Sequence, residues 1–488
     1  MNVSKSSHKM ISAGILVVVV SFGLHFGAGS FAMQFLSDQA RDASVIWNAW
    51  TEHRPILTGP TTSLGNVHTG PLFYYLYAPV LVAFQFEPVA GLVWGYGLFL
   101  LSCVVLWTVS REWLSRAASL VVVTLFATSE TILLYSLFPW NPNALPLFFL
   151  LWCLTMIVVI RNRSASLFES LTLAFLLAVL THLHLSTAIL ILVTLLSFIL
   201  FRIRGIRPLH LLLSVFVFVL SYVPLLVDNL QHANRDLTAL QTYQSGQTFN
   251  VFSVLEGTWN VLEHIVRMMI FTPFSERTGV SVLLTSFFLL GIVVLAFARH
   301  NSAIHRFLLL TLITTAFGLG MISPLQWHYL LPLAVFPLWI IGALVDSMLH
   351  RDNRLLLFGM VLPISLIIGI QLGSSIGHLV AVRNGFTVSG YGSEYPNDRE
   401  AVRAIVAHAE HFVGPIRIDV HRSSDNDVFR YLLRLEAPHL SSDAEEPIVR
   451  YLIRRPEDGS PEPPYQLLFE NTRTRVFWAE EPLFNEAS

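Results

Sequence analysis

Long apolar runs alternate with short polar connections along most of the chain. Many runs reach roughly 18 residues, the length with which a helix crosses a hydrocarbon core of ~30 Å. The pattern predicts eleven membrane-spanning helices, at approximately 11–33, 89–110, 117–137, 144–160, 165–181, 185–201, 209–227, 279–298, 305–322, 328–349 and 355–374. We interpret the first run as an uncleaved span, because it is long enough to cross. The expected fold is therefore an all-α polytopic membrane bundle.

One further apolar run, LFYYLYAPVLVAFQF (72–86), is short and contains Pro79. We expect a re-entrant or interfacial helix there, packed on the bundle where protein or a water-filled cavity covers its backbone.

Basic residues divide the connections into two sets. One set holds thirteen of them: Lys5, Lys9, Arg111, Arg116, Arg161, Arg163, Arg202, Arg204, Arg207, Arg299, Arg306, Arg351 and Arg354. The other set has longer loops but holds only five before the C-terminal segment: Arg41, Arg54, Arg235, Arg267 and Arg277. The positive-inside rule places the first set in the cytoplasm. We therefore expect a multi-pass protein of the cell (inner) membrane, with its N-terminus cytoplasmic and its C-terminal segment extracytoplasmic.

The composition changes beyond residue 380, where the apolar runs end. Of the 32 acidic residues, 18 follow position 390. The segment 397–412 has helical spacing, whereas 415–422, 449–455 and 465–478 are typical of strands. We expect two domains, a membrane domain at 1–375 and a small extracytoplasmic α+β domain at 376–488.

Composition excludes several classes of protein. The chain is 54% hydrophobic and only 13% charged, whereas soluble domains carry about 25% charged residues. A net charge of −2 gives no basic field for nucleic acid. Cys103 and Cys153 lie in apolar runs without neighbours at ligand spacing, so we expect neither a disulfide framework nor a zinc motif.

Unusual polar residues gather in the connections assigned to the outer face. These are the first external loop (34–71), PWNPN (139–143), THLHLS (181–186), the long loop 228–278 and SPLQWHYLLPL (323–333). A transporter more often has ionisable groups near the midplane of the bilayer. Polar chemistry at the outer surface suits a substrate with a lipid tail and a polar head.

The sequence SDQARDA (37–43) carries the strongest candidates. With Ser37 as the N-cap, Asp38, Arg41 and Asp42 fall on one face of a helix. On one interpretation they form an ordinary solvated ion-pair face. On the other, one carboxylate is a general base that takes a proton from an acceptor hydroxyl. The second carboxylate could then hold the base, an acceptor or a divalent cation, and Arg41 could contact a phosphate.

Other outer-face residues have a functional and a structural interpretation. His68 could contact a phosphate or an acceptor, or only bond the backbone of its loop. His182 and His184 would not share a face of a regular helix, so they could act together only in an irregular turn. Asn141 and Asn143 most simply cap helices.

Two charged residues lie within apolar segments. Glu130 is costly in lipid and could line a substrate cavity. Arg267, in VLEHIVRMMIF (261–271), could contact a lipid phosphate, although an interfacial amphipathic helix with a snorkelling arginine is the simpler interpretation.

These motifs and their order resemble a known superfamily over roughly residues 11–375. DQARDA after the first span, the segment GPTTSLGNVHTGPLFYYLYAP (59–79), the WNPN turn and a late HYLLPL (328–333) are similar to GT-C glycosyltransferases that use lipid-linked sugars. The closest likeness is to the family 39 type, related to protein O-mannosyltransferases and aminoarabinose transferases.

The resemblance implies a sugar donor on a polyprenyl phosphate and transfer with inversion at the anomeric carbon. Asp38 matches the catalytic aspartate of the family, and Asp42 would supply a second carboxylate. Gln39 stands where the family often has glutamate, which leaves metal dependence open, with Asp38 and Asp42 as the ligands if a metal binds. The segment 68–75, with His68 and Tyr74, occupies the place of a Pro-Pro-Leu-Tyr-Tyr segment.

The resemblance also concerns His328 and Tyr329. They stand where relatives commonly have Arg-Tyr, so phosphate binding there would be weaker or pH-dependent. The acceptor would be an unknown glycan, lipid or protein, and we expect no nucleic-acid partner.

Two other classes of function compete with a glycosyltransferase. A flippase or transporter of a lipid-linked saccharide would also have many spans and an outward site. It predicts paired midplane charges or broken helices in two related halves, and the sequence shows neither. A receptor or scaffold would leave the Asp-Arg-Asp cluster without a role.

Overall fold

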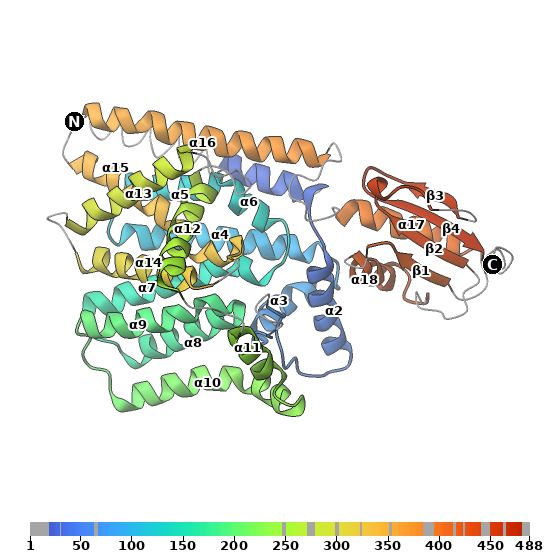
Figure 1. The fold of residues 1–488 in the computed structure, drawn as a ribbon, viewed down its shortest axis with the longest axis horizontal. Coiled ribbons are helices and arrows are strands. Elements are labelled where there is room, and N and C mark those ends of the chain that lie inside the picture. The colour runs from blue at the N-terminus through green and yellow to red at the C-terminus, as the bar shows by residue number, and fades with distance from the viewer. Residues whose placement is uncertain are drawn as a thin grey trace.

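The computed structural model describes residues 19–480 except 30, 63–66, 246–249, 271–278, 298–301, 323–324, 351–353, 384–394, 413–415, 423–424, 441–448 and 462–464. Most helices of the membrane domain lie side by side along the long axis of the molecule, and a small domain with a sheet stands beyond one end of the bundle (Figure 1). The mainly helical bundle with a C-terminal α+β domain confirms the expected fold class.

Each predicted span coincides with a helix or a pair of helices, although residues 11–18 lie outside the described part. The bounds are Val19–Gly29, α4 (Ala90–Arg111), α5 (Arg116–Thr128) with α6 (Glu130–Ser136), α7 (Leu145–Asn162), α8 (Leu167–Leu183), α9 (Ile189–Leu200), α10 (Pro208–Gln231), α13 (Gly279–Phe297), α14 (Ala303–Gly320), α15 (Val335–His350) and α16 (Arg354–Arg383).

Length and composition support fewer spans than the sequence predicts. Among the described residues, six helices are long and apolar enough to cross a membrane, or seven if α5 and α6, bent by 56°, form one span. The count of eleven therefore remains a prediction. Short 3₁₀ turns, η1 (Asn141–Ala144), η2 (Leu185–Ala188) and η3 (Trp327–Ala334), lead into α7, α9 and α15.

Three helices lie near the end of the bundle that faces the C-terminal domain: α2 (Ser37–Thr51), α3 (Leu72–Ala83) and α11 (Arg235–Ser245) (Figure 1). The 12 residues of α3 give a helix of about 18 Å at 1.5 Å per residue, too short to cross ~30 Å. That 72–86 does not cross stays a prediction, and this length agrees with it.

The helix α12 (Val251–Ile270) packs along α14, with its first turns exposed and its second half buried. Its Glu263 and Arg267 are both buried. An interfacial helix with a snorkelling Arg267 is therefore wrong, because the charged face of α12 turns toward neighbouring helices rather than toward water.

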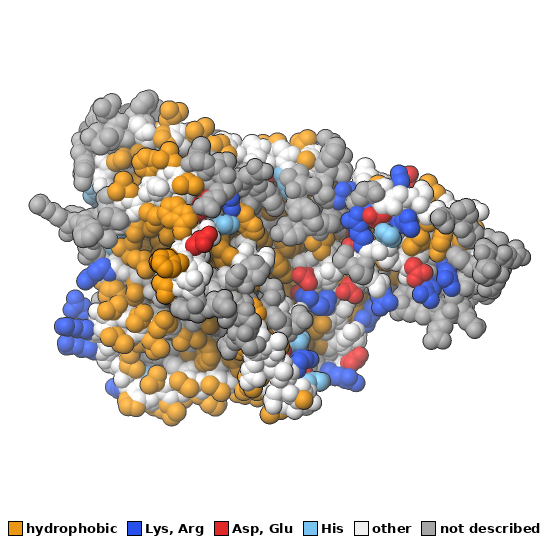
Figure 2. Space-filling view, viewed as in Figure 1, with side chains coloured by type: hydrophobic (Ala, Val, Ile, Leu, Met, Phe, Trp, Pro, Cys, Tyr) orange, Lys and Arg blue, Asp and Glu red, His pale blue; other side chains and the backbone are white. Residues whose placement is uncertain are grey.

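The surface of the bundle agrees with membrane insertion. The face of α10 exposes large apolar side chains, among them Leu211, Leu212 and Phe216. Lys and Arg side chains gather at the end of the bundle away from the C-terminal domain (Figure 2), where the α9–α10 connection lies (Figure 1). The Lys and Arg side chains that the structure describes on this face thus lie opposite the C-terminal domain (Figure 2).

The C-terminal domain is built on a four-stranded sheet with the order β1-β2-β4-β3. Its elements are α17 (Tyr395–Ala409), β1 (Ile416–Val420), α18 (Asn426–Glu436), β2 (Val449–Arg454), β3 (Gln466–Glu470) and β4 (Arg475–Glu480). β1 and β2 pair parallel, and the other pairs are antiparallel. The segment 465–478 is an antiparallel pair rather than a single strand. The helix α18 is an addition to the sequence prediction.

Candidate functional site

The helix α2 begins at Ser37, with Leu36 as its N-cap. The side-chain oxygen of Gln39 accepts a hydrogen bond from the backbone N–H of Leu36 at 3.0 Å. The expected capping role of Ser37 is therefore wrong, because the third helical residue instead reaches back to the N-cap, as in half of a capping box. Gln39 thus has a structural role at the start of the helix.

The predicted Asp38, Arg41 and Asp42 do meet on one face of α2. Arg41 Nη1 lies 2.9 Å from Asp38 Oδ1, and Arg41 Nη2 lies 2.9 Å from Asp42 Oδ1. Arg41 Nε also donates to Asp42 Oδ1, at 3.0 Å. The guanidinium therefore lies between the two carboxylates.

The two carboxylates differ in exposure. The side chain of Asp38 is 47% exposed, whereas that of Asp42 is 2% exposed. Asp38 can therefore meet a substrate directly, while Asp42 is enclosed by protein.

A tyrosine from α3 completes the cluster. Tyr74 OH donates to Asp42 Oδ1 at 2.8 Å, so this oxygen accepts bonds from both Arg41 and Tyr74. Within the described part, Asp42 Oδ2 and the nearby buried Tyr77 OH have no hydrogen-bond partner. Buried polar atoms usually have a hydrogen-bond partner, so these two oxygens between α2 and α3 are unsatisfied by the residues that the structure describes.

Burial sets the electrostatics of this cluster. Burial raises the pKa of Asp42 to about 6, and the opposing effects of Arg41 and Tyr74 offset this only in part. Burial alone would lower the pKa of Arg41, but the charges of Asp42 and Asp38 outweigh it and the net shift is upward. Arg41 therefore stays cationic, and Asp42 can change its charge in mildly acidic solution.

A divalent cation does not suit this arrangement. The guanidinium of Arg41 already occupies the space between the carboxylates and would repel a metal ion. Across the described ranges, no group of three or more His, Cys, Asp or Glu side chains is placed to hold a metal.

His68 lies in a second cluster, formed with the region that follows α10. His68 Nδ1 lies 2.7 Å from Asp236 Oδ1, and its backbone N–H donates to the same oxygen at 3.1 Å. Asn229 Nδ2 donates to Asp236 Oδ2 at 2.8 Å. Although burial opposes it, hydrogen bonds from His68 and Asn229 lower the pKa of Asp236. These contacts fasten the first external loop to the α10–α11 region.

The two histidines of THLHLS are buried and belong to different groups. His182 Nδ1 is 3.4 Å from the backbone N of Leu72, and its Nε2 is 3.2 Å from Ser221 Oγ. His184 is the extended C-cap of α8, and its Nδ1 lies 2.7 Å from Ser186 Oγ. The turn is irregular, as joint action of the two histidines would require, but the two imidazole rings contact different residues.

His184 joins the aromatic group around the late HYLLPL motif. Its ring centroid lies 5.4 Å from that of His328 and 4.5 Å from that of Tyr329. His328 also contacts Trp140 of the PWNPN turn at 4.5 Å. Three external connections predicted from the sequence therefore meet here.

Arg267 lies beside this group. Its guanidinium carbon is 4.9 Å from the ring centroid of Trp327, the residue that precedes His328. A cation supplied by α12 thus lies next to the start of the HYLLPL motif.

Glu130 lies at the break between α5 and α6, inside the bundle. Its Oε2 accepts a hydrogen bond from Ser374 Oγ at 2.7 Å, and its Oε1 lies 4.0 Å from His378 Nδ1. Its backbone N–H donates to Gln371 at 2.8 Å. Glu130 therefore faces a polar stripe of α16.

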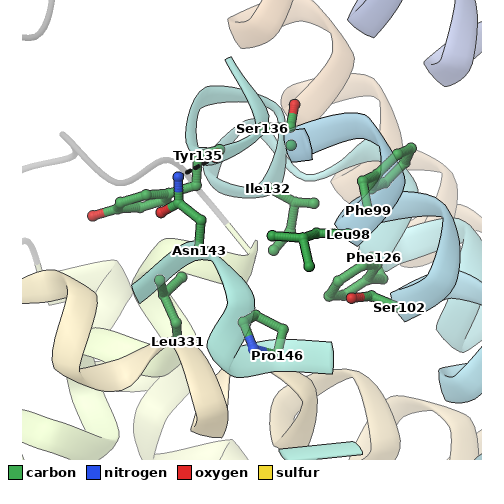
Figure 3. Close-up of a pocket in the computed structure, with 11 residues that line it drawn as sticks. Leu98, Phe99, Ser102, Phe126, Ile132, Tyr135, Ser136, Asn143, Pro146 and Leu331 are labelled. Atoms are coloured by element: carbon green, nitrogen blue, oxygen red, sulfur yellow. Dashed lines mark hydrogen bonds between the residues drawn. The ribbon is translucent and has the colours of Figure 1, made fainter. Parts of the chain in front are cut away.

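A small cavity of about 30 Å³ lies between α4, α6, α7 and η3, with room for about one water molecule. Leu98, Phe126 and Ile132 form one side, and Asn143 and Tyr135 the other (Figure 3). None of the predicted site residues lines it, so it is separate from the α2 cluster.

The asparagines of PWNPN cap helix ends, as predicted. Asn143 donates to the backbone O of Tyr135 near the end of α6, and Asn141 donates to that of Leu183 at the end of α8. The carbonyls at these C-termini would otherwise lack an intrahelical donor.

Sequence reasoning missed Tyr77, Asn229 and Asp236. Tyr77 lies one helical turn beyond Tyr74, and this spacing is a signal that was available. Asp236 is 168 positions from His68, and no local pattern connects them.

No family model matches the chain, and no curated protein matches its sequence. Solved structures do match. ArnT from Cupriavidus metallidurans bound to undecaprenyl phosphate superposes with a TM-score of 0.58 at 13% identity, over 95% of this chain and 97% of that one. The apo form of the same protein gives 0.50 at the same identity and coverage.

The chain has a GT-C fold. The resemblance inferred from the motifs is thus confirmed at the level of the fold. The oligosaccharyltransferase of Archaeoglobus fulgidus matches more weakly, with a TM-score of 0.49 at 12% identity, over 87% of this chain and 63% of that one.

Proposed function

We propose that the protein is a membrane glycosyltransferase that moves a sugar from a polyprenyl-phosphate donor to an acceptor hydroxyl on the outer face of the membrane, with inversion. The observation that carries this proposal is the cluster on α2, where Arg41 lies between a half-exposed and a buried carboxylate. The shared fold adds support, because ArnT has been captured with undecaprenyl phosphate.

In the proposed reaction, Asp38 takes the proton of the acceptor hydroxyl. The acceptor oxygen forms a bond to the anomeric carbon while the bond from that carbon to the phosphate oxygen breaks. Both electrons of the broken bond leave with the polyprenyl phosphate. Arg41 stabilises the negative charge that develops on the leaving phosphate, an electrostatic effect that is usually large in enzymes.

Of the remaining predicted residues, two would position Arg41 and the others would bind the substrate. Tyr74 and Asp42 hold Arg41 in place. The group around His184, His328 and Tyr329, with Arg267 beside it, would meet the lipid phosphate or the sugar. His68, His182 and Glu130 would line the route to the site.

The orientation of the chain follows from the same proposal. The C-terminal domain and α2 would lie outside the cytoplasm, and the basic connections inside. The donor would then enter sideways from the outer leaflet, with its tail between the spans.

The test uses purified protein in liposomes with undecaprenyl-phosphate-linked hexoses, pentoses and aminopentoses as donors. A membrane extract supplies acceptors, and the release of undecaprenyl phosphate is measured. Asp38→Asn should abolish release while protein level and undecaprenyl phosphate binding persist. Glu52→Gln, which changes an exposed carboxylate at the other end of α2, is the matched control and should keep wild-type rates.

One observation favours a flippase as the second candidate. The apolar helix pair α5 and α6 is bent just before Glu130, and His378 faces the Glu130 carboxylate. A broken helix with a buried pair of ionisable groups is a feature of transporters. Translocation of a fluorescent lipid-linked sugar in liposomes, lost in Glu130→Gln but kept in Asp38→Asn, would favour the flippase. Release of undecaprenyl phosphate that requires Asp38 would favour the transferase.

A further inference from the structure

The back of α2, opposite the carboxylate cluster, is covered by the C-terminal domain. Trp47 follows Asp38 by nine positions, about 2.5 helical turns, and so points to the opposite side. Its ring stacks on Phe86 with centroids 4.8 Å apart and meets Tyr431 of α18 edge-on at 5.4 Å. An aromatic group from three parts of the chain therefore holds this face.

Polar contacts complete the cover. Arg434 of α18 places its guanidinium carbon 4.3 Å from the Trp47 ring centroid and donates to Asn48 Oδ1 at 2.6 Å. Tyr431 OH donates to the backbone O of Phe86 at 2.5 Å. The helix α18 thus binds both α2 and the turn after α3.

A second set of contacts fixes α17 to the membrane domain. Arg399 Nη1 and Nη2 donate to the two carboxylate oxygens of Glu87, each at 2.9 Å. Tyr395 OH donates to the same carboxylate at 3.2 Å, and the Tyr395 backbone N–H donates to the O of Met33, just before α2, at 2.9 Å. A bidentate arginine–carboxylate pair restricts geometry in a way that a single contact does not.

We propose that the C-terminal domain is a positioning element for the catalytic helix. Tyr431 and Arg434 contact Trp47 on the back of α2, and the Glu87–Arg399 pair fixes α17 to the turn after α3. These five residues are called the clamp below, and Tyr74 contacts α2 from the front. The catalytic part of this inference rests on the proposed function, since it assigns chemistry to Asp38 and Arg41. A clamp matters for such a site because misplacing a catalytic group by about 1 Å can cost ~100-fold in rate.

Two clamp variants separate this role from general stability. Glu87→Gln removes the negative charge with which Arg399 pairs. Arg434→Ala removes both the cation–π contact with Trp47 and the hydrogen bond to Asn48. Arg475→Ala is the matched control, because Arg475 pairs with Glu470 inside the C-terminal domain. Arg434→Lys tests rescue, since a lysine can still place a cation over the indole.

The first readout is amide hydrogen exchange of the full-length protein in nanodiscs. In both clamp variants we expect exchange of residues 37–51 to rise by about tenfold or more, with α7 unchanged. The control should match the wild type. Unchanged exchange in α2 in both variants would overturn the clamp.

The second readout is the kinetics of undecaprenyl phosphate release. We expect kcat to fall about tenfold in Arg434→Ala, with the KM for the donor within twofold, and Arg434→Lys to restore most of the rate. Faster exchange in α2 with unchanged kcat would refute the positioning role. If the wild type releases nothing from any donor, the proposed function fails, while the exchange experiment still decides whether the clamp exists.

Discussion

Replacing Asp42 by asparagine tests how the buried carboxylate supports the site. Asp42 Oδ1 accepts hydrogen bonds from Arg41 Nε, Arg41 Nη2 and Tyr74 OH, at 3.0, 2.9 and 2.8 Å. An asparagine oxygen can still accept these bonds, so the shape of the site is nearly kept. The negative charge is lost, and an amide NH₂ replaces one of the carboxylate oxygens.

The expected loss follows from these three bonds. A hydrogen bond to a charged group contributes about 1.5–3 kcal/mol, and one between neutral groups about 1 kcal/mol. Adding the differences for the three bonds gives the range of free energy that the substitution could cost. Arg41 is partly exposed and keeps its contact with Asp38, so we expect a cost toward the lower end of this range. We take it as roughly 2–3 kcal/mol of positioning free energy, which corresponds to a fall in kcat of about 30- to 150-fold.

The assay is release of undecaprenyl phosphate by the purified protein in liposomes, with kcat and KM measured separately. The fall should appear mainly in kcat, because Asp42 is buried and does not touch the donor. A kcat within threefold of the wild type would refute the reasoning, and so would a loss confined to KM. Amide hydrogen exchange in α7 like that of the wild type shows that the variant is folded.

Two further predictions concern the same cluster. Tyr74→Phe removes one of the hydrogen bonds to the Asp42 carboxylate. At about 1.5 kcal/mol, the lower end for a bond to a charged group, kcat should fall roughly tenfold in the same release assay. Tyr77→Phe deletes a hydroxyl that has no partner among the described residues and should leave kcat within twofold. Because burial raises the pKa of Asp42 to about 6, this carboxyl takes up a proton as the pH falls through 6 and weakens its hold on Arg41. Transfer should therefore decline below pH 6, and this limb should be absent from the pH profile of Asp42→Asn. The pKa of Asp42 is higher in the folded protein than in the unfolded chain. The contribution of Asp42 to the free energy of unfolding therefore decreases as the pH rises between about 4 and 6, whereas activity increases over the same range.

Local spacing explains why the α2 cluster could be predicted from the sequence. Residues three and four positions apart share a face of any helix, so Asp38, Arg41 and Asp42 had to lie together once α2 formed. The helices over the long apolar runs were predictable for a similar reason, since an apolar run of sufficient length has few other stable environments. Both inferences need only the order of residues within one element.

Contacts between distant segments were not predictable in this way. His68 meets Asp236, and Glu130 meets His378, because of how whole helices pack. The amphipathic pattern of α18 was present in the sequence, but nothing in it indicates that Tyr431 and Arg434 turn toward α2. Burial of Arg267 was missed because an amphipathic helix can face either lipid and water or the interior of the bundle, and its pattern alone does not distinguish these two environments.

The difference in exposure between the two carboxylates supports the division of roles that we propose. A general base must come within hydrogen-bond reach of a substrate hydroxyl, and the half-exposed Asp38 meets this requirement without rearrangement. Asp42 does not, because its oxygens are enclosed by α2 and α3. Its enclosed charge is instead well placed to fix Arg41, since a buried ion pair is shielded from solvent and is strongly destabilised when one partner is removed. Asp42 thus holds Arg41 from one side, the clamp holds α2 from the other, and Asp38 is left as the carboxylate of this cluster that can reach a substrate.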